Sequence, residues 1–180
     1  MRKKFPILTF SFVVLVLIVS LSCYSLAQGV TAGSKFTAAL SKLRENISEL
    51  RMLNYDLAEA VQNPESPNFC FIALSVAEIE AALIRCKYEI DLLELTKSIK
   101  PEIRPFHVEH RIEYLKILTM FLILAIEHVE SNDAMIQKEE ALRLTHKAKK
   151  LIKSSIGVVE EIIEALESGK KVQNLQDREI

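Results

Sequence analysis

The chain has 180 residues, of which 49% are hydrophobic and 26% charged, and its formal net charge is −1. This mild and mixed charge excludes the concentrated positive surface that nucleic-acid binding requires. With four glycines, five prolines and no tryptophan, the chain has too little turn chemistry for an all-β fold, so the composition favours helices.

The first 27 residues have the pattern of a secretory signal peptide. Basic residues at positions 2–4 precede an uncharged apolar run that includes seven consecutive aliphatic residues at 13–19, and the run ends in Ser25-Leu26-Ala27. A basic start, an apolar middle and small residues at −3 and −1 predict cleavage before Gln28. We therefore expect a periplasmic or secreted protein, whose mature chain is long enough for one domain with a single core.

Two other fates of the leader stay open. Cys23 is a candidate for lipidation, although Leu21 lies one position too close to it to make a good lipobox. The apolar run, at about 20 residues, is also long enough to remain as an uncleaved signal anchor, which the small residues before Gln28 disfavour. The later uncharged stretch at 117–126 has the length of a core helix and is too short for a membrane span.

The sequence predicts one folded domain after the leader. Residues 28–33 are expected to be a short linker, residues 34–170 a bundle of four helices, and residues 171–180 a polar C-terminal tail. The predicted connections are short, and short connections force consecutive helices to lie as antiparallel neighbours. The expected fold class is therefore all-α, an antiparallel up-down-up-down four-helix bundle, with helices over about 34–62, 67–99, 105–130 and 134–168.

The first two predicted helices each carry a seam, which here means a line of apolar residues at alternating steps of four and three that packs against partner helices. Asn54 is the polar member of the first seam, and a buried Asn at such a position fixes helix register at some cost in stability. The two seams are Phe36, Leu40, Leu43, Ile47, Leu50, Asn54, Leu57 and Val61, and Phe69, Ile72, Val76, Ile79, Leu83, Cys86, Ile90 and Leu93.

The third predicted helix has two adjacent seams, which predicts that it is the most enclosed of the four. They consist of Val108, Ile112, Leu115, Thr119, Leu122, Ile126 and Val129, and of Tyr114, Leu118, Phe121 and Ala125. The fourth helix is expected to be capped by Asp133. Its inner face is predicted to hold Ala148, Ile152, Val159, Ile162 and Leu166, and its solvated face Glu160, Glu161, Glu164 and Glu167.

Cys70 and Cys86 fall 16 residues apart in one predicted helix. A helix of that length separates their Cα atoms by roughly 24 Å, whereas a disulfide tolerates about 7 Å. We therefore predict that they do not pair with each other, so that both are free or one crosslinks to another chain. Cys86 lies on the second seam and is expected to act as a small buried hydrophobic residue.

Histidines provide the sharpest candidates for a metal or cofactor site. His107 and His110 share one helix face at a spacing that can chelate a divalent metal, with Glu161 or Glu164 as further ligands. The simpler interpretation is a pair of surface histidines at a helix start, and no metal ligand is assigned.

Haem and di-iron motifs are also weak or missing in this sequence. The Glu-x-x-His pair of di-iron bundles and the Cys-x-x-Cys-His motif of c-type haem are absent. A b-type haem would need Met52 and His146 to turn inward together, although Met52 occupies an outward position of its heptad.

Two further surface features allow a functional and a simpler interpretation. A basic stripe on the fourth helix has the chemistry for weak contact with a membrane surface, but the outer face of a soluble helix looks the same; it comprises Arg143, Lys147, Lys149, Lys150 and Lys153. Asn46-Ile47-Ser48 matches a glycosylation sequon that matters only in a eukaryotic host.

The functional prediction follows mainly from missing motifs. The sequence has no nucleophile motif or cofactor motif, and its predicted loops are too short to carry an active site. We therefore expect a non-enzymatic, extracytoplasmic helical-bundle protein that acts through protein–protein contacts or as a small adaptor, with no nucleic-acid partner. The alternative is a metal- or haem-binding four-helix-bundle carrier.

Overall fold

The computed structural model describes residues 7–60, 69–97 and 104–176, with side chains described over 34–60, 69–96 and 106–169. Over these ranges the chain forms four α-helices and no strand, which confirms the predicted all-helical class. The helices are α1 (Ile7–Ala60), α2 (Phe69–Lys97), α3 (Arg104–Asp133) and α4 (Glu139–Gln176). The basic start of the predicted signal peptide and the first two predicted connections lie outside the described residues.

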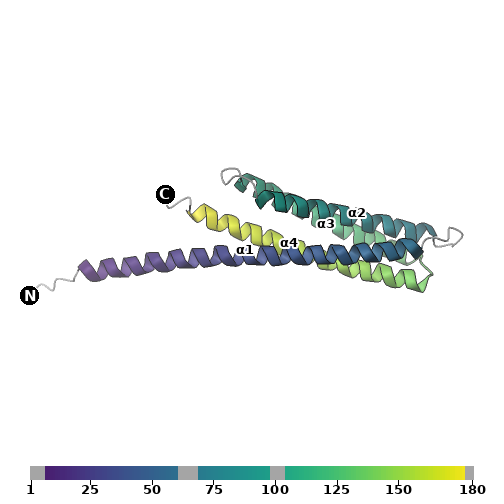
Figure 1. The fold of residues 1–180 in the computed structure, drawn as a ribbon, viewed down its shortest axis with the longest axis horizontal. Helices are drawn as coiled ribbons and strands as arrows, with labels where there is room; N and C mark the ends of the chain where they lie inside the picture. The colour runs from purple at the N-terminus through teal and green to yellow at the C-terminus, as the bar shows by residue number, and fades with distance from the viewer. Residues whose placement is uncertain (1–6, 61–68, 98–103, 177–180) are drawn as a thin grey trace, which may run out of the picture.

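The helices lie side by side, with α1 and α4 forming one pair and α2 and α3 the other (Figure 1). Each helix contacts two main neighbours, because α1 and α3 both pack against α2 and α4. The N-terminal part of α1 extends beyond the other three helices (Figure 1). Where side chains are described, no helix is long and apolar enough to span a membrane.

The first two seams occupy the core of this arrangement. All of their described members are buried or half-buried, and Asn54 is only 6% exposed. Burial of the seams stabilises the helices by removing apolar surface from water, at about 25 cal/mol for each Å². The described residues therefore confirm the two heptad patterns as core positions. All four helices contribute fully buried large side chains, among them Leu43, Ile79, Leu115 and Ile152.

Two predicted boundaries differ from the structure. Asp133 is the last residue of α3 and α4 begins at Glu139, so Asp133 does not cap α4. Backbone hydrogen bonds from Met135 N to Asn132 O (2.9 Å) and from Ile136 N to Asp133 O (3.1 Å) extend the end of α3. The acidic Glu139 and Glu140 in the first turn of α4 favour a helix start there, because carboxylates stabilise a helix N-terminus.

The ends of the domain are more helical than expected. Residues 28–33, predicted as a linker, continue α1 without a break, and α4 runs through the first part of the predicted tail to Gln176. The spacing of apolar residues predicts a helix only where the helix has an apolar face to bury. A helix backbone can extend past that face wherever its residues have adequate helix propensity.

Candidate interaction surface

The structure contradicts the prediction that α3 is the most enclosed helix. In its second seam Leu118 and Ala125 are buried, but Tyr114 is 48% and Phe121 39% exposed. Among the described residues, α3 packs only against α2 and α4. Two neighbours cannot cover an apolar face this wide, so its outer part faces solvent.

Exposed apolar side chains gather on α2 and α3. Of fourteen exposed large hydrophobic residues among the described ones, four lie on α2, seven on α3 and none on α4. Ten of the eleven form what we call the α2–α3 face. Ile123 is left out because Lys116 and Glu130, seven residues before and after it and so on the same side of α3, pair with residues of α4. The α2–α3 face consists of Leu74, Ile84, Tyr88 and Leu95 of α2 and Phe106, Tyr114, Ile117, Met120, Phe121 and Leu124 of α3.

The α2–α3 face has the spacing of a helix-packing surface. On α3 the residues Tyr114, Ile117, Phe121 and Leu124 follow one another at steps of three, four and three. On α2 the same steps run through Leu74, Ala77, Ala81, Ile84, Tyr88, Asp91 and Leu95. Alternating steps of three and four are the pattern by which one helix packs against another, yet here they face outward.

Two arginines hold the aromatic rings of the face in place. The guanidinium of Arg85 on α2 lies 4.2 Å from the ring centroid of Phe121 on α3, and that of Arg111 lies 4.6 Å from the ring of Tyr114. Such cation–π contacts stabilise a ring by about 0.5–1 kcal/mol at exposed sites. Each guanidinium covers part of one ring, and Phe121 and Tyr114 remain 39% and 48% exposed.

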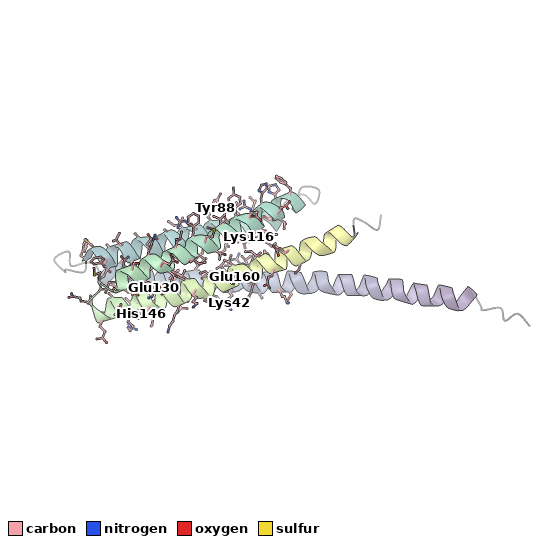
Figure 2. The ribbon with its side chains drawn as sticks, turned by 180° about the vertical axis from the view of Figure 1, so that it is seen from behind. Lys42, Tyr88, Lys116, Glu130, His146 and Glu160 are labelled. Carbon is pink, nitrogen blue, oxygen red and sulfur yellow. The ribbon has the colours of Figure 1, made fainter. Side chains whose placement is uncertain are left out.

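Charges of both signs border the face. Asp91 is exposed within the α2 series and Lys87 is exposed beside it, and Glu113 and Lys116 are exposed on α3 and paired at 3.1 Å. Tyr88 projects from α2 on the side away from α1 and α4 (Figure 2). The face is thus mainly apolar, with charges of both signs in and beside it, and protein–protein interfaces combine apolar and polar residues in this way.

Buried amides join α1 to its two neighbours. Asn54 donates from Nδ2 to Glu80 Oε2 on α2 at 3.0 Å, while its Oδ1 atom is buried without a hydrogen-bond partner among the described residues. Asn46 is 9% exposed and donates from Nδ2 to the Oγ atoms of Ser154 (3.1 Å) and Ser155 (3.3 Å) on α4. Asn54 lies buried in its seam as predicted. The side chain of Asn46, the acceptor residue of the sequon, is instead buried and hydrogen-bonded in the core.

A buried ion pair joins α2 to α3 beneath the α2–α3 face. Arg111 Nη1 lies 3.3 Å from Glu89 Oε2, with the two side chains 15% and 8% exposed. Desolvation raises the pKa of Glu89 above its ordinary value, and the Arg111 charge lowers it in part. Burial, with a further contribution from Glu89, raises the pKa of Cys86 from 9.0 to about 12, so this thiol stays protonated at neutral pH.

The prediction that the two cysteines do not pair with each other is confirmed. One continuous helix, α2, carries both Cys70 and Cys86, and both are free, with Cys70 exposed and Cys86 2% exposed. Cys86 is a small core residue of the second seam.

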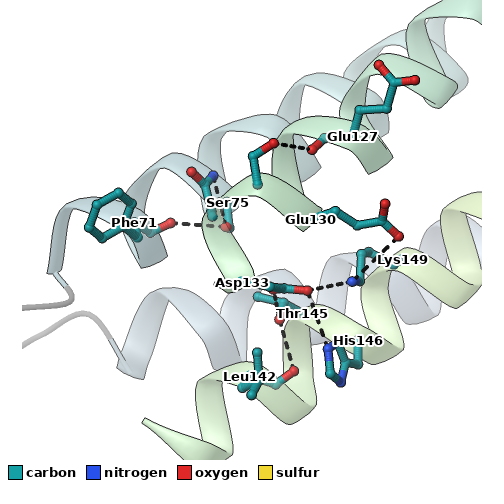
Figure 3. Close-up of polar contacts among 11 residues, drawn as sticks. Phe71, Ser75, Glu127, Glu130, Asp133, Leu142, Thr145, His146 and Lys149 are labelled. Carbon is teal, nitrogen blue, oxygen red and sulfur yellow. Dashed lines mark hydrogen bonds and ion pairs between the residues drawn. The ribbon is translucent and has the colours of Figure 1, made fainter. Parts of the chain in front are cut away.

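Polar side chains fasten the corner between α3 and α4 (Figure 3). The Asp133 carboxylate lies 2.5 Å from Lys149 Nζ and 3.4 Å from His146 Nε2, and it accepts a hydrogen bond from Thr145 Oγ1 at 2.6 Å. Lys149 also lies 3.7 Å from Glu130. Because these contacts join Asp133 at the end of α3 to three side chains of α4, the corner acts as a structural clamp in place of the predicted helix cap.

The structure does not bring the histidine candidates together with further ligands. His110 is exposed and packs edge-on against Phe106 at 4.4 Å between ring centroids, and His107 does so at 6.1 Å. The described residues contain no group of three His, Cys, Asp or Glu side chains placed to hold a metal. Met52 and His146 are both exposed, so the haem pair does not turn inward.

The charged surfaces of α4 lie largely as expected. Glu160, Glu161, Glu164 and Glu167 are all exposed, which confirms the solvated face. Four members of the basic stripe are exposed, while Lys149 is half-buried at the clamp. The stripe therefore keeps the accessibility that a surface contact requires.

Comparison of the chain with family models, with curated proteins and with solved structures finds no match.

Proposed function

We propose that the protein is a non-enzymatic, extracytoplasmic helical-bundle protein that acts through protein–protein contacts, with the α2–α3 face as its contact surface. The observation that carries this proposal is the exposure of ten large apolar residues, eight of which follow helix-packing spacing. Large exposed apolar patches on soluble domains mark interaction sites. The signal-peptide pattern of the first 27 residues supports action outside the cytoplasm.

The proposal includes an antiparallel up-down-up-down bundle. Between α1 and α2, Asn54 is hydrogen-bonded to Glu80 and Arg44 forms an ion pair with Glu94. The residue earlier in α1 therefore contacts the residue later in α2, as in antiparallel helices. The contacts between α2 and α3, Glu78–His128 and Glu89–Arg111, follow the same antiparallel order. So do the contacts between α3 and α4, Lys116–Glu167 and Glu130–Lys149. This topology makes α2 and α3 adjacent over their length and their outer surfaces one continuous face.

In-cell photo-cross-linking tests the contact surface. The full chain is expressed in its natural host with a photoreactive benzoylphenylalanine in place of Met120, which is 64% exposed on the face. The matched control carries the same group in place of Met52, which is 62% exposed on α1 outside the face. Because the two positions are equally accessible, different yields report proximity to a protein rather than reactivity.

We expect discrete protein adducts from position 120 and few from position 52. Mass spectrometry of each adduct gives the identity of the captured chain, and recovery of the adducts with the periplasmic or secreted fraction tests the location. Equal yields at the two positions, or no adduct at position 120, would show that the face is not a contact surface.

A further inference from the structure

We propose that the α2–α3 face binds a second copy of this chain, so that two bundles pack with α2 and α3 of one against α2 and α3 of the other. This inference rests on the proposed function, because it names the partner for the same surface. The occupant is helical because both exposed seams have the three–four spacing by which helices pack.

The size of the face matches what a stable dimer requires. With about 150–200 Å² for a fully exposed large side chain, ten side chains that are 39–64% exposed present about 800–1,100 Å². A standard protein–protein interface buries about 800 Å² on each partner. A typical monomer leaves at most about 300–600 Å² in its largest apolar patch, so the face exceeds what an isolated chain usually exposes.

The shape and charge of the face suit self-association. In a two-fold dimer the same patch serves both copies, and each side must be complementary to itself. Along the α2 seam the small Ala77 and Ala81 are followed by the large Ile84 and Tyr88. Knobs and depressions on one patch allow it to interlock with its own copy, as facing helices do in coiled coils.

The border of the face favours a protein partner over a lipid surface. Lys87 and Lys116 stand beside Asp91 and Glu113, so each sign on one copy can meet the opposite sign on the other. Binding to an anionic membrane would instead call for a border of basic residues. Aromatic residues and Met, which are enriched at protein interfaces, make up half of the face: Tyr88, Phe106, Tyr114, Met120 and Phe121.

Co-purification of two differently tagged full-length copies from one cell tests the dimer. The disrupting variant combines Tyr88→Glu and Met120→Glu, at side chains that are 61% and 64% exposed on the face. The matched control combines Tyr55→Glu and Met52→Glu, at side chains that are 72% and 62% exposed on α1. Both variants place two new carboxylates on exposed positions of the same residue types, and circular dichroism melts check that each remains folded.

We expect the second copy to be recovered with the wild type and with the control. Its recovery should fall by at least about tenfold with the disrupting variant, because substitutions at interface hot spots change affinity by tenfold or more. Sedimentation velocity of the purified protein should give the mass of two chains for the wild type and of one chain for the disrupting variant. Absence of co-purification in the wild type, or equal loss in both variants, would overturn the dimer. Photo-adducts at position 120 with a different protein only would overturn it as well while supporting the proposed function.

Discussion

Glu89 of α2 and Arg111 of α3 form an ion pair at 3.3 Å between side chains that are only 8% and 15% exposed. The pair lies below the α2–α3 face and directly links the two helices that build it. Burying a carboxylate costs free energy even beside an arginine, since desolvation opposes the Coulombic gain. The pKa of Glu89 is raised because of this desolvation cost.

The first prediction concerns the pH dependence that Glu89 contributes. Because its folded-state pKa is raised above 4.5, the folded state binds the proton more tightly than the unfolded state. The stability that protonation contributes is complete below the unfolded pKa and is lost as pH rises through the raised pKa. We therefore expect the free energy of unfolding of the wild type to fall relative to that of Glu89→Gln as pH rises from the unfolded pKa to the raised pKa of Glu89. Urea denaturation at a series of pH values measures both.

Above the raised pKa the difference between wild type and Glu89→Gln should become constant. The uncompensated charge of Arg111 in the variant shifts the whole difference but adds no pH dependence, since an arginine stays protonated. Glu164→Gln, which removes one exposed carboxylate, is the control. A wild type that gains stability relative to Glu89→Gln as pH rises would contradict the prediction.

A second prediction tests the amide that joins α1 to α4. Asn46→Ala removes both hydrogen bonds to Ser154 and Ser155 and leaves their hydroxyls without this donor. We expect a loss of about 1–3 kcal/mol in the free energy of unfolding, the typical cost of an unsatisfied buried polar group. Ser48→Ala, at an exposed position two residues away, should change stability by less than about 0.5 kcal/mol. Chemical denaturation measures both, and equal effects would place Asn46 outside the core.

Much of the fold could be predicted from the sequence because the signals are local and repeat. The seams of α1 and α2 place Leu43 and Ile79 in the core through spacing alone, and α2 is continuous through both cysteines as expected. The partners of Asn46 are about 108 residues away, and no local pattern identifies them. Its sequence neighbourhood suggested a sequon instead.

The α2–α3 face could not be predicted for a different reason. Periodicity shows that Tyr114 and Phe121 lie on an apolar face, but it does not show whether a neighbouring helix covers that face. Coverage depends on how four helices pair in space, and α3 has only α2 and α4 beside it. Similarly, Asp133 is a residue type that often caps helices, but its carboxylate instead contacts Thr145, 12 residues further along the chain, and Lys149, both of which lie on α4.

A third prediction separates the two sides of α3. Leu122 is 1% exposed, so Leu122→Ala should cost about 2–5 kcal/mol through lost burial and the cavity left behind. Leu124→Ala removes the same atoms from a side chain that is 44% exposed, and at dilutions that dissociate the proposed dimer we expect less than about 1 kcal/mol. Glu164→Ala, on the solvated face, should stay within about 0.5 kcal/mol. Similar losses for Leu122→Ala and Leu124→Ala would mean that the faces of α3 are misassigned.

Thiol labelling provides a fourth prediction. Cys70 is exposed, whereas Cys86 is buried and its pKa is raised to about 12. Since the thiolate is the reactive form, alkylation at pH 8 should modify the peptide that contains Cys70 quickly and the peptide that contains Cys86 only after unfolding in urea. Peptide mass spectrometry follows each site separately. Equal native rates at the two cysteines would show that α2 does not hold Cys86 in the core.

The last prediction concerns the leader, for which the sequence left three fates open. Cleavage at the small residues before Gln28 should give a product whose N-terminal sequence begins Gln28-Gly29-Val30. Lipidation would instead give a chain that begins at Cys23 and partitions into detergent, and an uncleaved anchor would leave the full chain in the membrane fraction. N-terminal sequencing and intact mass of the protein recovered from its natural host distinguish the three. Either of the membrane-bound products would refute release of the bundle from its leader.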